Sequence, residues 1–361
     1  MCSCYGLGVP PSLLSSAASA SDAHSRLTRA GLGGSPLESK LLESVGTGGV
    51  SALEYTVSEG VAIVSLGGAS PGQESLWGTK EEEHRLEPRR VLGLLNALDQ
   101  AENDPSVFAL VISAEGRFWC NGFDLLWIQN RMDLANALQE AVELLLARIL
   151  QYPKPTLAAV NGHATAAGAM LMLACDFTIM NADKGFVFMP GIDLGLAYSP
   201  GMTSLMASKL PQQLHRDFII YAQRFTAKTL ASHGVVETAP PEQVLPQALQ
   251  RAHKVKEKTK HPATMARIKA TLYHEAIAAL QYQPDRMYIQ PRLVEMGFDN
   301  VPVGDDRPGS NKEEVCQGRR GGEEIDVRPT GPDRCPVPPD EDVTMDKHLA
   351  YIQTQNAHFL N

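Results

Sequence analysis

The 361-residue chain lacks an excess of basic charge and long apolar runs. Its 32 Lys and Arg residues are outnumbered by 41 Asp and Glu residues, which gives a formal net charge of −9. Non-specific binding to nucleic-acid phosphates therefore has little electrostatic support. Charged residues, Pro or Gly interrupt every apolar stretch before the roughly 18 residues that a membrane-spanning helix needs. We expect neither a nucleic-acid partner nor a membrane span.

Cysteine is sparse and irregularly spaced. The cysteines of the chain are Cys2, Cys4, Cys120, Cys175, Cys316 and Cys335. Their spacing fits neither a disulfide scaffold nor a set of paired zinc ligands. We expect reduced thiols in an intracellular compartment and no metal site.

Core-forming residues are scarce at both ends of the chain. Residues 1–50 are rich in Ser, Ala and Gly and contain no acid before Asp22, which predicts a disordered or targeting leader. Residues 298–343 are dense in Gly, Pro and charge and predict a low-complexity linker, after which 344–361 could form a short terminal helix. The chain ends His-Phe-Leu-Asn, without a C-terminal peroxisomal tripeptide.

Between these ends, strand and helix patterns alternate. The β-branched runs Leu53–Val57 and Val61–Leu66 flank Ser58-Glu59-Gly60 and predict a hairpin. Further strands are expected at 107–113, 156–160, 177–180 and 186–189, and helices between 88 and 105, at 133–150 and at 166–174. The repeated order of strand followed by helix indicates the α/β class.

Two glycine-containing stretches could carry chemistry. Gly116–Leu125 follows a buried strand and places Gly122 in a turn, and Pro153–Gly168 runs from a strand through a Gly/Ala-rich turn into a helix. Free N–H groups at such turns and at helix N-termini favour a negative oxygen. Two of them aimed at one point would form an oxyanion hole, which suits a thioester carbonyl becoming an enolate. Alternatively, both turns are packing devices, which Gly-rich strand-to-helix turns often are.

The residues in these stretches resemble known motifs. Trp119–Leu125 is similar to F-x-x-G-x-D-L, and the elements P-K-P, A-V-N-G and A-C-D occur in order between Pro153 and Asp176. Together they resemble the crotonase superfamily of acyl-CoA enzymes, over about residues 52–290. Glu83–Pro88 and Asn161-Gly-His-Ala are most similar to the plant-type Δ3,Δ2-enoyl-CoA isomerases.

The resemblance implies an α/β fold in which repeated ββα units form a crotonase-like spiral core, here over residues 51–210. A helical C-terminal region at 211–297 would follow, through which family members associate, so we expect a homo-trimer or hexamer. The implied partner is a fatty acyl-CoA thioester. No cofactor is expected, because CoA is part of the substrate. The family suggests a peroxisome, while the leader allows a mitochondrion or plastid.

The resemblance also implies an oxyanion hole made of backbone groups. The first amide would be that of Phe123, which follows Gly122, and the second that of Ala167, in the small-residue triplet that ends at Gly168. Because both donors are backbone groups, an alanine at 167 keeps the hydrogen bond. Asp124 in the first motif would mainly organise its loop.

One feature departs from the family pattern. Aligning Met189–Leu196 with the family places Gly191 where the catalytic Glu of similar isomerases and hydratases lies. The second Glu of the hydratases falls on Met170, so activation of water by two carboxylates is unsupported. Some relatives carry the acid a few residues later, where this chain has Tyr198. We include Gly122, Asp124, Gly168 and Tyr198 in the predicted substrate-binding set.

Three residues could replace the missing base. Asp193 lies two residues after Gly191, although a structural role is favoured for it. His163 has a useful ordinary pKa but is better explained as a packed, hydrogen-bonded histidine. Tyr198 would need a strongly perturbed pKa. The five Lys and Arg residues within 251–260 indicate a solvated helical face or, given the family, contacts to CoA phosphates.

These observations lead to one main expectation and two alternatives. We expect binding of a fatty acyl-CoA and isomerisation of 3-enoyl-CoA to trans-2-enoyl-CoA in fatty-acid β-oxidation. The vacant position Gly191 favours a catalytically reduced acyl-CoA-binding protein as the first alternative. The second is an acyl-CoA thioester hydrolase or hydratase.

Overall fold

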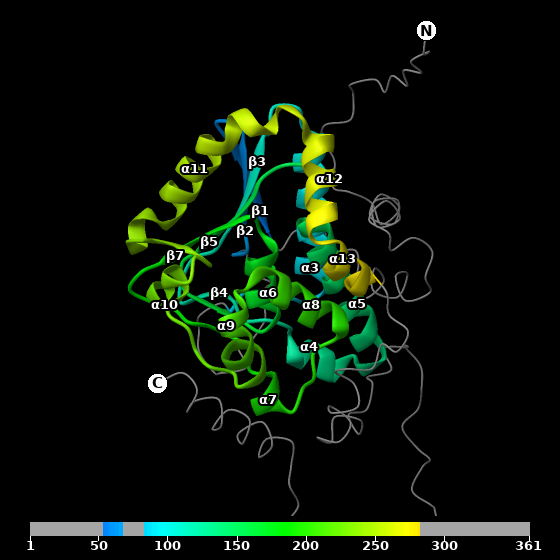
Figure 1. The fold of residues 1–361 in the computed structure, drawn as a ribbon. Coiled ribbons are helices and arrows are strands. Elements are labelled where there is room, and N and C mark those ends of the chain that lie inside the picture. The colour runs from blue at the N-terminus through cyan, green and yellow to red at the C-terminus, as the bar shows by residue number, and fades with distance from the viewer. Residues whose placement is uncertain (1–52, 68–82, 282–361) are drawn as a thin grey trace, which may run out of the picture. The chain divides into compact units, whose positions relative to one another are not determined.

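The computed structural model describes residues 53–67 and 83–281 (Figure 1). The predicted leader, linker and terminal helix lie outside these residues, as do residues 282–297 of the predicted helical region. All described residues belong to one compact unit. Among them, no helix combines the length and apolarity that crossing a bilayer requires.

A six-stranded sheet forms the centre of this unit, in the order β1-β2-β3-β5-β7-β9. Its strands are β1 (Glu54–Ser58), β2 (Val61–Ser65), β3 (Ala109–Ser113), β5 (Thr156–Val160), β7 (Phe177–Asn181) and β9 (Glu237–Ala239). The predicted hairpin is confirmed, because β1 pairs antiparallel with β2 and the turn residues Glu59 and Gly60 have φ values of 49° and 80°. All other pairs in this sheet are parallel.

A second sheet of three short parallel strands places the chemistry-bearing turns. It consists of β4 (Phe118–Cys120), β6 (His163–Thr165) and β8 (Val187–Phe188). Each short strand follows a strand of the large sheet and precedes a helix, so the predicted ββα repeat is confirmed. Because parallel strands share a direction, the turns after β4 and β6 meet at the same edge.

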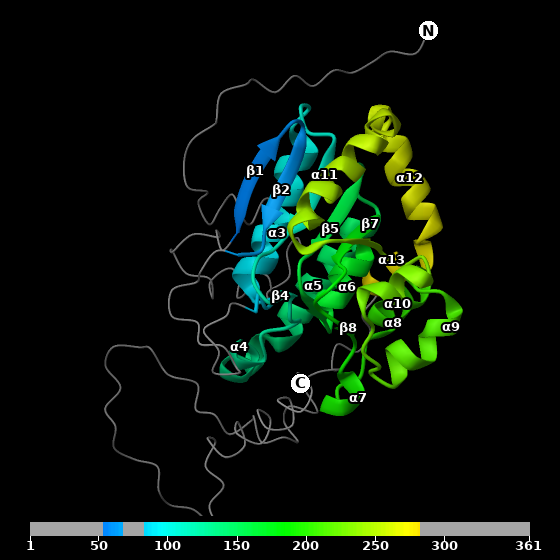
Figure 2. The ribbon, with the colours of Figure 1, turned by 90° about the vertical axis from the view of Figure 1, so that its left-hand side faces the viewer.

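Helices follow the strands of both sheets, and the first and third of them pack over one face of the large sheet. They are α3 (Pro88–Asn103), α4 (Leu125–Asn130), α5 (Ala135–Leu150), α6 (Ala167–Ala174), α7 (Gly191–Leu194) and α8 (Pro200–Lys209). Leu110 and Ile112 of β3 face the core beneath α3 and α5, while Ala109 and Val111 face a smaller core beneath α11 (Val244–Val255). Burial on both faces explains the continuous apolar run of this strand. In Figure 2, α11 lies in front of the large sheet and α3 behind it.

The region after residue 210 is mainly helical, as predicted. Besides α11 it contains α9 (Gln212–His215), the π-helical turn η3 (Arg216–Ile220), α10 (Ala227–Ser232), α12 (Pro262–Leu272) and α13 (His274–Gln281). It also contributes β9, which pairs in parallel with β7 and completes the large sheet. The boundary predicted at residue 210 therefore does not separate sheet from helices. Two of the three β9 residues are exposed, which left no alternating pattern to predict the strand.

Candidate active site

The Phe123 amide is aimed by hydrogen bonds of its neighbours. Leu86 N–H donates to the Gly122 carbonyl at 2.7 Å, and Asp124 N–H donates to the Leu86 carbonyl at 3.2 Å. In a trans peptide, the N–H points opposite to the preceding C=O, so the bond at Gly122 turns the Phe123 N–H away from Leu86. Within the described residues, the Phe123 N–H donates to no acceptor.

The Ala167 amide is aimed in the same way at the start of α6. The Ala166 carbonyl accepts from Met170 N–H at 3.2 Å, so the Ala167 N–H points out of the helix N-terminus. Ala166 has φ 51°, a left-handed value that costs a non-glycine residue roughly 1–3 kcal/mol. Its own N–H is held by the Phe188 carbonyl at 3.1 Å. In the part of the chain that the structure covers, the Ala167 N–H has no acceptor either.

The two turns that carry these amides touch each other. Gly122 has φ +77°, and a Cβ there would lie 3.3 Å from Ala167 N and 2.8 Å from Ala166 Cβ. Gly168 is equally constrained, since its Cβ would lie 2.2 Å from the Cys120 carbonyl oxygen. Both glycines therefore allow α6 to approach the turn after β4. The structure places the Phe123 and Ala167 amides in adjacent turns, and their joint binding of an oxygen stays a prediction.

Asp124 organises its loop, as expected. It is buried and is the N-cap of α4, where a side-chain oxygen accepts from Trp127 N–H at 3.0 Å. Asp176 likewise fixes a turn, because it accepts from Thr156 N–H at 2.9 Å and from the Lys269 ammonium. Neither contact gives these carboxylates a role in proton transfer.

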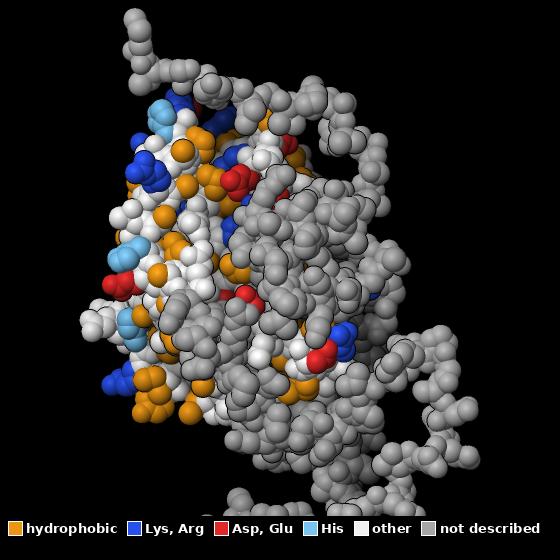
Figure 3. Space-filling model, turned by 90° about the vertical axis from the view of Figure 1, so that its right-hand side faces the viewer, with side chains coloured by type: hydrophobic (Ala, Val, Ile, Leu, Met, Phe, Trp, Pro, Cys, Tyr) orange, Lys and Arg blue, Asp and Glu red, His pale blue; other side chains and the backbone are white. Residues whose placement is uncertain are grey.

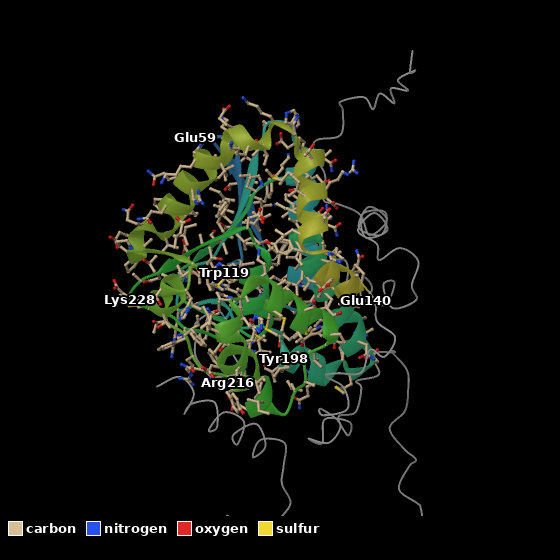
Figure 4. All side chains as sticks on the ribbon, in the orientation of Figure 1. Glu59, Trp119, Glu140, Tyr198, Arg216 and Lys228 are labelled. Carbon is tan, nitrogen blue, oxygen red and sulfur yellow. The ribbon has the colours of Figure 1, made fainter. Side chains whose placement is uncertain are left out.

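The position that aligns with the family Glu is enclosed. Gly191 is buried at the start of α7, and its N–H donates to the Tyr198 hydroxyl at 2.7 Å. A Cβ at residue 191 would lie 2.3 Å from the Tyr198 hydroxyl and 2.6 Å from the Leu196 carbonyl oxygen. The side chain of Tyr198, labelled in Figure 4, thus takes the space that a larger residue 191 would need.

Neither neighbour of this position is an evident base. Burial raises the pKa of Tyr198 to about 12, so the phenol keeps its proton at neutral pH. The Gly191 N–H opposes this rise, and the charge of Asp193 adds to it. Asp193 lies on α7 with an exposed side chain. Partial removal of its carboxyl from water raises its pKa, and the positive charge of Arg224 opposes this rise. Of the two, Asp193 alone can accept a proton near neutral pH.

His163 is a packed, hydrogen-bonded residue, as predicted. It is buried on β6, with ring-centroid distances of 5.3 Å to Phe118 and 5.7 Å to Phe186. Its Nδ1 accepts from Phe186 N–H at 3.2 Å. Burial, followed by the charges of Arg117 and Arg224, lowers its pKa to about 4. The imidazole is therefore neutral at physiological pH.

The cysteines in the motifs are inert. Cys120 and Cys175 are buried free thiols, and burial raises their pKa values to about 11 and about 12. Met170 is also buried, in the core of α6. Among residues 53–67 and 83–281, no group of three His, Cys, Asp or Glu side chains is arranged to hold a metal ion.

The basic segment 251–260 lies at the opposite edge of the sheet from the two amides. Arg251 pairs with Glu237 at 2.8 Å, and His253 lies 3.5 Å from Glu59 in the β1–β2 turn. Figure 4 shows Glu59 far from Tyr198. These contacts are at the amino ends of the parallel strands, so the structure does not bring this segment to the two amide turns.

On the face drawn in Figure 3, Lys and Arg side chains are interspersed with Asp and Glu.

Four polar residues to which the sequence analysis gave no individual role lie beside the two amide turns. Glu83 accepts from Arg85 Nε at 2.6 Å and from Asn121 Nδ2 at 3.2 Å, and Asn121 Oδ1 accepts from the Thr165 hydroxyl. Asn121 precedes Phe123 by two residues, as Thr165 precedes Ala167. This shared spacing, together with the place of Glu83 and Arg85 in the motif Glu83–Pro88, was the signal that the sequence offered.

The fold defines an α/β protein built from ββα repeats, and comparison with known proteins identifies its family. Residues 83–290 match the family described as enoyl-CoA hydratase/isomerase. The chain is 30% identical over 226 residues to enoyl-CoA delta isomerase 2, peroxisomal, of Arabidopsis thaliana, covering 60% of this chain and 94% of that relative. It is 31% identical over 192 residues to 2,3-dehydroadipyl-CoA hydratase of Escherichia coli K12, covering 53% of this chain and 74% of that relative.

Solved structures agree on the fold. An enoyl-CoA hydratase from Polaromonas sp. JS666 matches with a TM-score of 0.53 and 26% identity, over 67% of this chain and 90% of that one. The apo structure of an enoyl-CoA isomerase from Mycobacterium tuberculosis matches with a TM-score of 0.56 and 24% identity, over 63% and 94% of the two chains. The chain belongs to the enoyl-CoA hydratase/isomerase family, the crotonase superfamily, and is most similar to its plant-type isomerases.

Proposed function

We propose that this protein binds a fatty acyl-CoA thioester and isomerises 3-enoyl-CoA to trans-2-enoyl-CoA in fatty-acid β-oxidation. The observation that carries the proposal is the pair of main-chain N–H groups, Phe123 and Ala167, that lack an acceptor in the described residues and lie in touching turns. The names of the similar Arabidopsis proteins support isomerisation as the reaction.

The reaction follows from where negative charge develops. The thioester oxygen accepts hydrogen bonds from the two amides, which stabilises the dienolate formed when a proton leaves C2. The C2–H bond breaks, a C4–H bond forms, and the double bond moves from C3=C4 to C2=C3. One carrier can remove and return the same proton. We assign this role to Asp193, because Tyr198 keeps its own proton and His163 is buried and hydrogen-bonded.

A second candidate is acyl-CoA binding without turnover. The observation that favours it is the Tyr198 hydroxyl, which fills the space beside Gly191 and leaves no room for a side chain there. The amides would still hold a thioester, because they do not depend on residue 191. Hydration has less support, because the buried Met170 stands at the position where the hydratases have the second carboxylate that activates water.

Two measurements on the purified full chain separate these candidates. The first is calorimetric binding of a saturated acyl-CoA, and the second is the absorbance of the conjugated product formed from 3-enoyl-CoA. Binding with turnover supports the isomerase, binding alone supports the second candidate, and the absence of both overturns the proposal.

The role of Asp193 is tested by a matched pair of variants. If Asp193 carries the proton, Asp193→Asn lowers kcat on the order of 100-fold or more, the range of general acid–base catalysis. Asp183→Asn is the control, because Asp183 is also an exposed aspartate and lies in the turn after β7. Equal kcat values for both variants would remove Asp193 from the mechanism.

We also propose a peroxisomal location and self-association. Two of the similar Arabidopsis isomerases carry the word peroxisomal in their names. Imaging the full chain beside a version that lacks residues 1–50 tests whether the leader directs import elsewhere. Light scattering of the purified protein tests for a trimer or hexamer, and a monomer would contradict the proposal.

A further inference from the structure

A continuous chain of side-chain hydrogen bonds joins the two turns that carry the amides. The Thr165 hydroxyl donates to Asn121 Oδ1, and Asn121 Nδ2 donates to Glu83 Oε2 at 3.2 Å. The same carboxylate oxygen accepts from Arg85 Nε at 2.6 Å, and Arg85 Nη1 donates to the Phe123 carbonyl at 3.1 Å. The chain therefore begins two residues before Ala167 and ends on Phe123 itself.

The main chain reinforces this connection. Asn121 N–H donates to the Glu83 carbonyl at 3.0 Å, next to the bond from Leu86 N–H to the Gly122 carbonyl. Glu83, Arg85 and Thr165 are buried, and Asn121 is half-buried. Buried, mutually satisfied polar groups are held rigidly, because breaking one bond leaves a group desolvated without a partner.

The placement matters because the two amides come from different segments. β4 and β6 pair in parallel with a register shift between Phe118 and Cys120, and their last backbone pair is Cys120 with Ala164. Asn121 is the first residue after β4, and Thr165 is the last residue of β6. The hydrogen bond from Thr165 to Asn121 directly joins the segment after β4 to the end of β6. It lies two residues before each of the two amides.

We propose that Asn121 and Thr165 are positioning residues that set the separation of the Phe123 and Ala167 amides for a thioester oxygen, with Glu83 and Arg85 anchoring Asn121. This inference rests on the proposed thioester binding. The inference goes beyond that proposed function. It states that side chains that touch neither substrate nor reacting atoms determine how strongly the two amides polarise the thioester. Misplacement of such donors by about 1 Å weakens their effect on the transition state.

The test uses the full chain and a conjugated aryl-enoyl-CoA as an optical probe. Hydrogen bonds to the thioester oxygen polarise the conjugated system and move its absorbance maximum to longer wavelength. Recorded at saturating protein, this shift reports polarisation per bound probe and does not depend on affinity or on the folded fraction. A purely structural role for Thr165 or Asn121 would change stability and leave the shift unchanged.

The variants form a double-mutant cycle. Thr165→Val breaks the bond to Asn121, and Asn121→Ala breaks both this bond and the one to Glu83, so Asn121→Ala should reduce the red shift at least as much as Thr165→Val. The double variant should reduce it no further than Asn121→Ala alone. Thr165→Ser keeps the hydroxyl and should restore the wild-type shift. Thr178→Val is the control, because Thr178 is also buried and donates to a main-chain carbonyl, at 3.4 Å from Met172 O, but lies on β7 away from the two turns.

The outcomes separate this inference from the proposed function. A wild-type protein that binds the probe without any red shift, or does not bind it, overturns the thioester site and the inference with it. A wild-type red shift that persists unchanged in Asn121→Ala and Thr165→Val overturns the positioning role alone. Because the two variants act on opposite ends of one bond, either of them suffices if the other does not fold.

Discussion

The site that we propose has a thioester-binding half and a proton-transfer half, and the two are built differently. In the first, hydrogen bonds at Gly122 and Ala166 aim two backbone amides, and close glycine contacts hold their turns together. In the second, the position aligned with the family carboxylate is Gly191, and the Tyr198 hydroxyl occupies the adjoining space. The first half consists of main-chain groups and the second depends on side chains.

This difference shows how binding and chemistry can separate within one fold. A backbone donor survives a change of side chain, as at Ala167, provided that the local conformation is kept. A proton carrier, by contrast, depends on one side chain, and we propose Asp193 for this role because residue 191 is glycine. At Gly191, the Tyr198 hydroxyl fills the space that a side chain would need. Restoring the carboxylate therefore requires more than the reverse substitution.

The largest effect is expected from breaking the thioester-binding half at Gly122. In Gly122→Ala, the new Cβ would lie 2.8 Å from Ala166 Cβ and 3.3 Å from Ala167 N, so the two turns must separate. We expect acyl-CoA turnover to fall about 100-fold, which is the usual loss when one oxyanion donor is removed. Turnover, or probe polarisation if the wild type is inactive, is the measurement.

The control for this variant is Gly116→Ala. Gly116 has the same φ of +77°, but a Cβ there meets nothing within 4 Å. Both variants therefore carry the same left-handed backbone cost, about 1–2 kcal/mol, and only the first carries the collision. Equal losses in the two variants would show that backbone strain, and not contact between the turns, explains the effect.

The next effect concerns the closed proton-transfer half. We expect Gly191→Glu to lower the free energy of unfolding by about 1–3 kcal/mol and to gain no isomerase activity, because its Cβ collides with the Tyr198 hydroxyl and the Leu196 carbonyl. Adding Tyr198→Ala removes one of these collisions. Urea unfolding of both single variants and the double variant should show a double-variant loss smaller than the sum of the single losses. Strict additivity would contradict the steric explanation.

The next prediction concerns how the stability of the protein depends on pH through His163, which lies on β6 before the Ala167 turn. The pKa of His163 is lowered from 6.5 to about 4 by burial, so the unfolded chain takes up a proton between these values and the folded chain does not. Stability should therefore fall as the pH drops from about 6.5 to about 4, by on the order of 1–3 kcal/mol. In His163→Asn, whose amide oxygen can still accept from Phe186 N–H, this part of the pH dependence should disappear. Identical pH profiles of unfolding would refute the assignment.

The smallest effect compares helix caps in the two halves. Asp124 caps α4 beside the thioester-binding turn, and Ser199 caps α8 after Tyr198, with its hydroxyl 3.1 Å from Met202 N. Replacing either by Ala should cost about 1 kcal/mol in thermal unfolding. Only Asp124→Ala should also weaken acyl-CoA binding, because it loosens the loop that carries the Phe123 amide. Equal affinities in calorimetry would show that this loop keeps its shape without its cap.

Much of the fold could be predicted from local patterns. The strand at 156–160 was predicted with its observed bounds, and the helix at 166–174 differs by one residue, because period and turn residues act over short distances. The roles of Asp124 and His163 could also be predicted from their motifs. β9 could not, because two of its three residues are exposed and it is defined by pairing with β7.

The sequence by itself determined the alternation of strands and helices, the hairpin turn, and the two glycine turns that present amides, since each depends on residues close together in the chain. Only the tertiary structure decided that Tyr198 fills the space beside Gly191, and that Thr165 reaches Asn121 and Asn121 reaches Glu83. The latter pairs are 44 and 38 residues apart. Contacts over such separations arise from how the sheet brings segments together, which no local periodicity encodes.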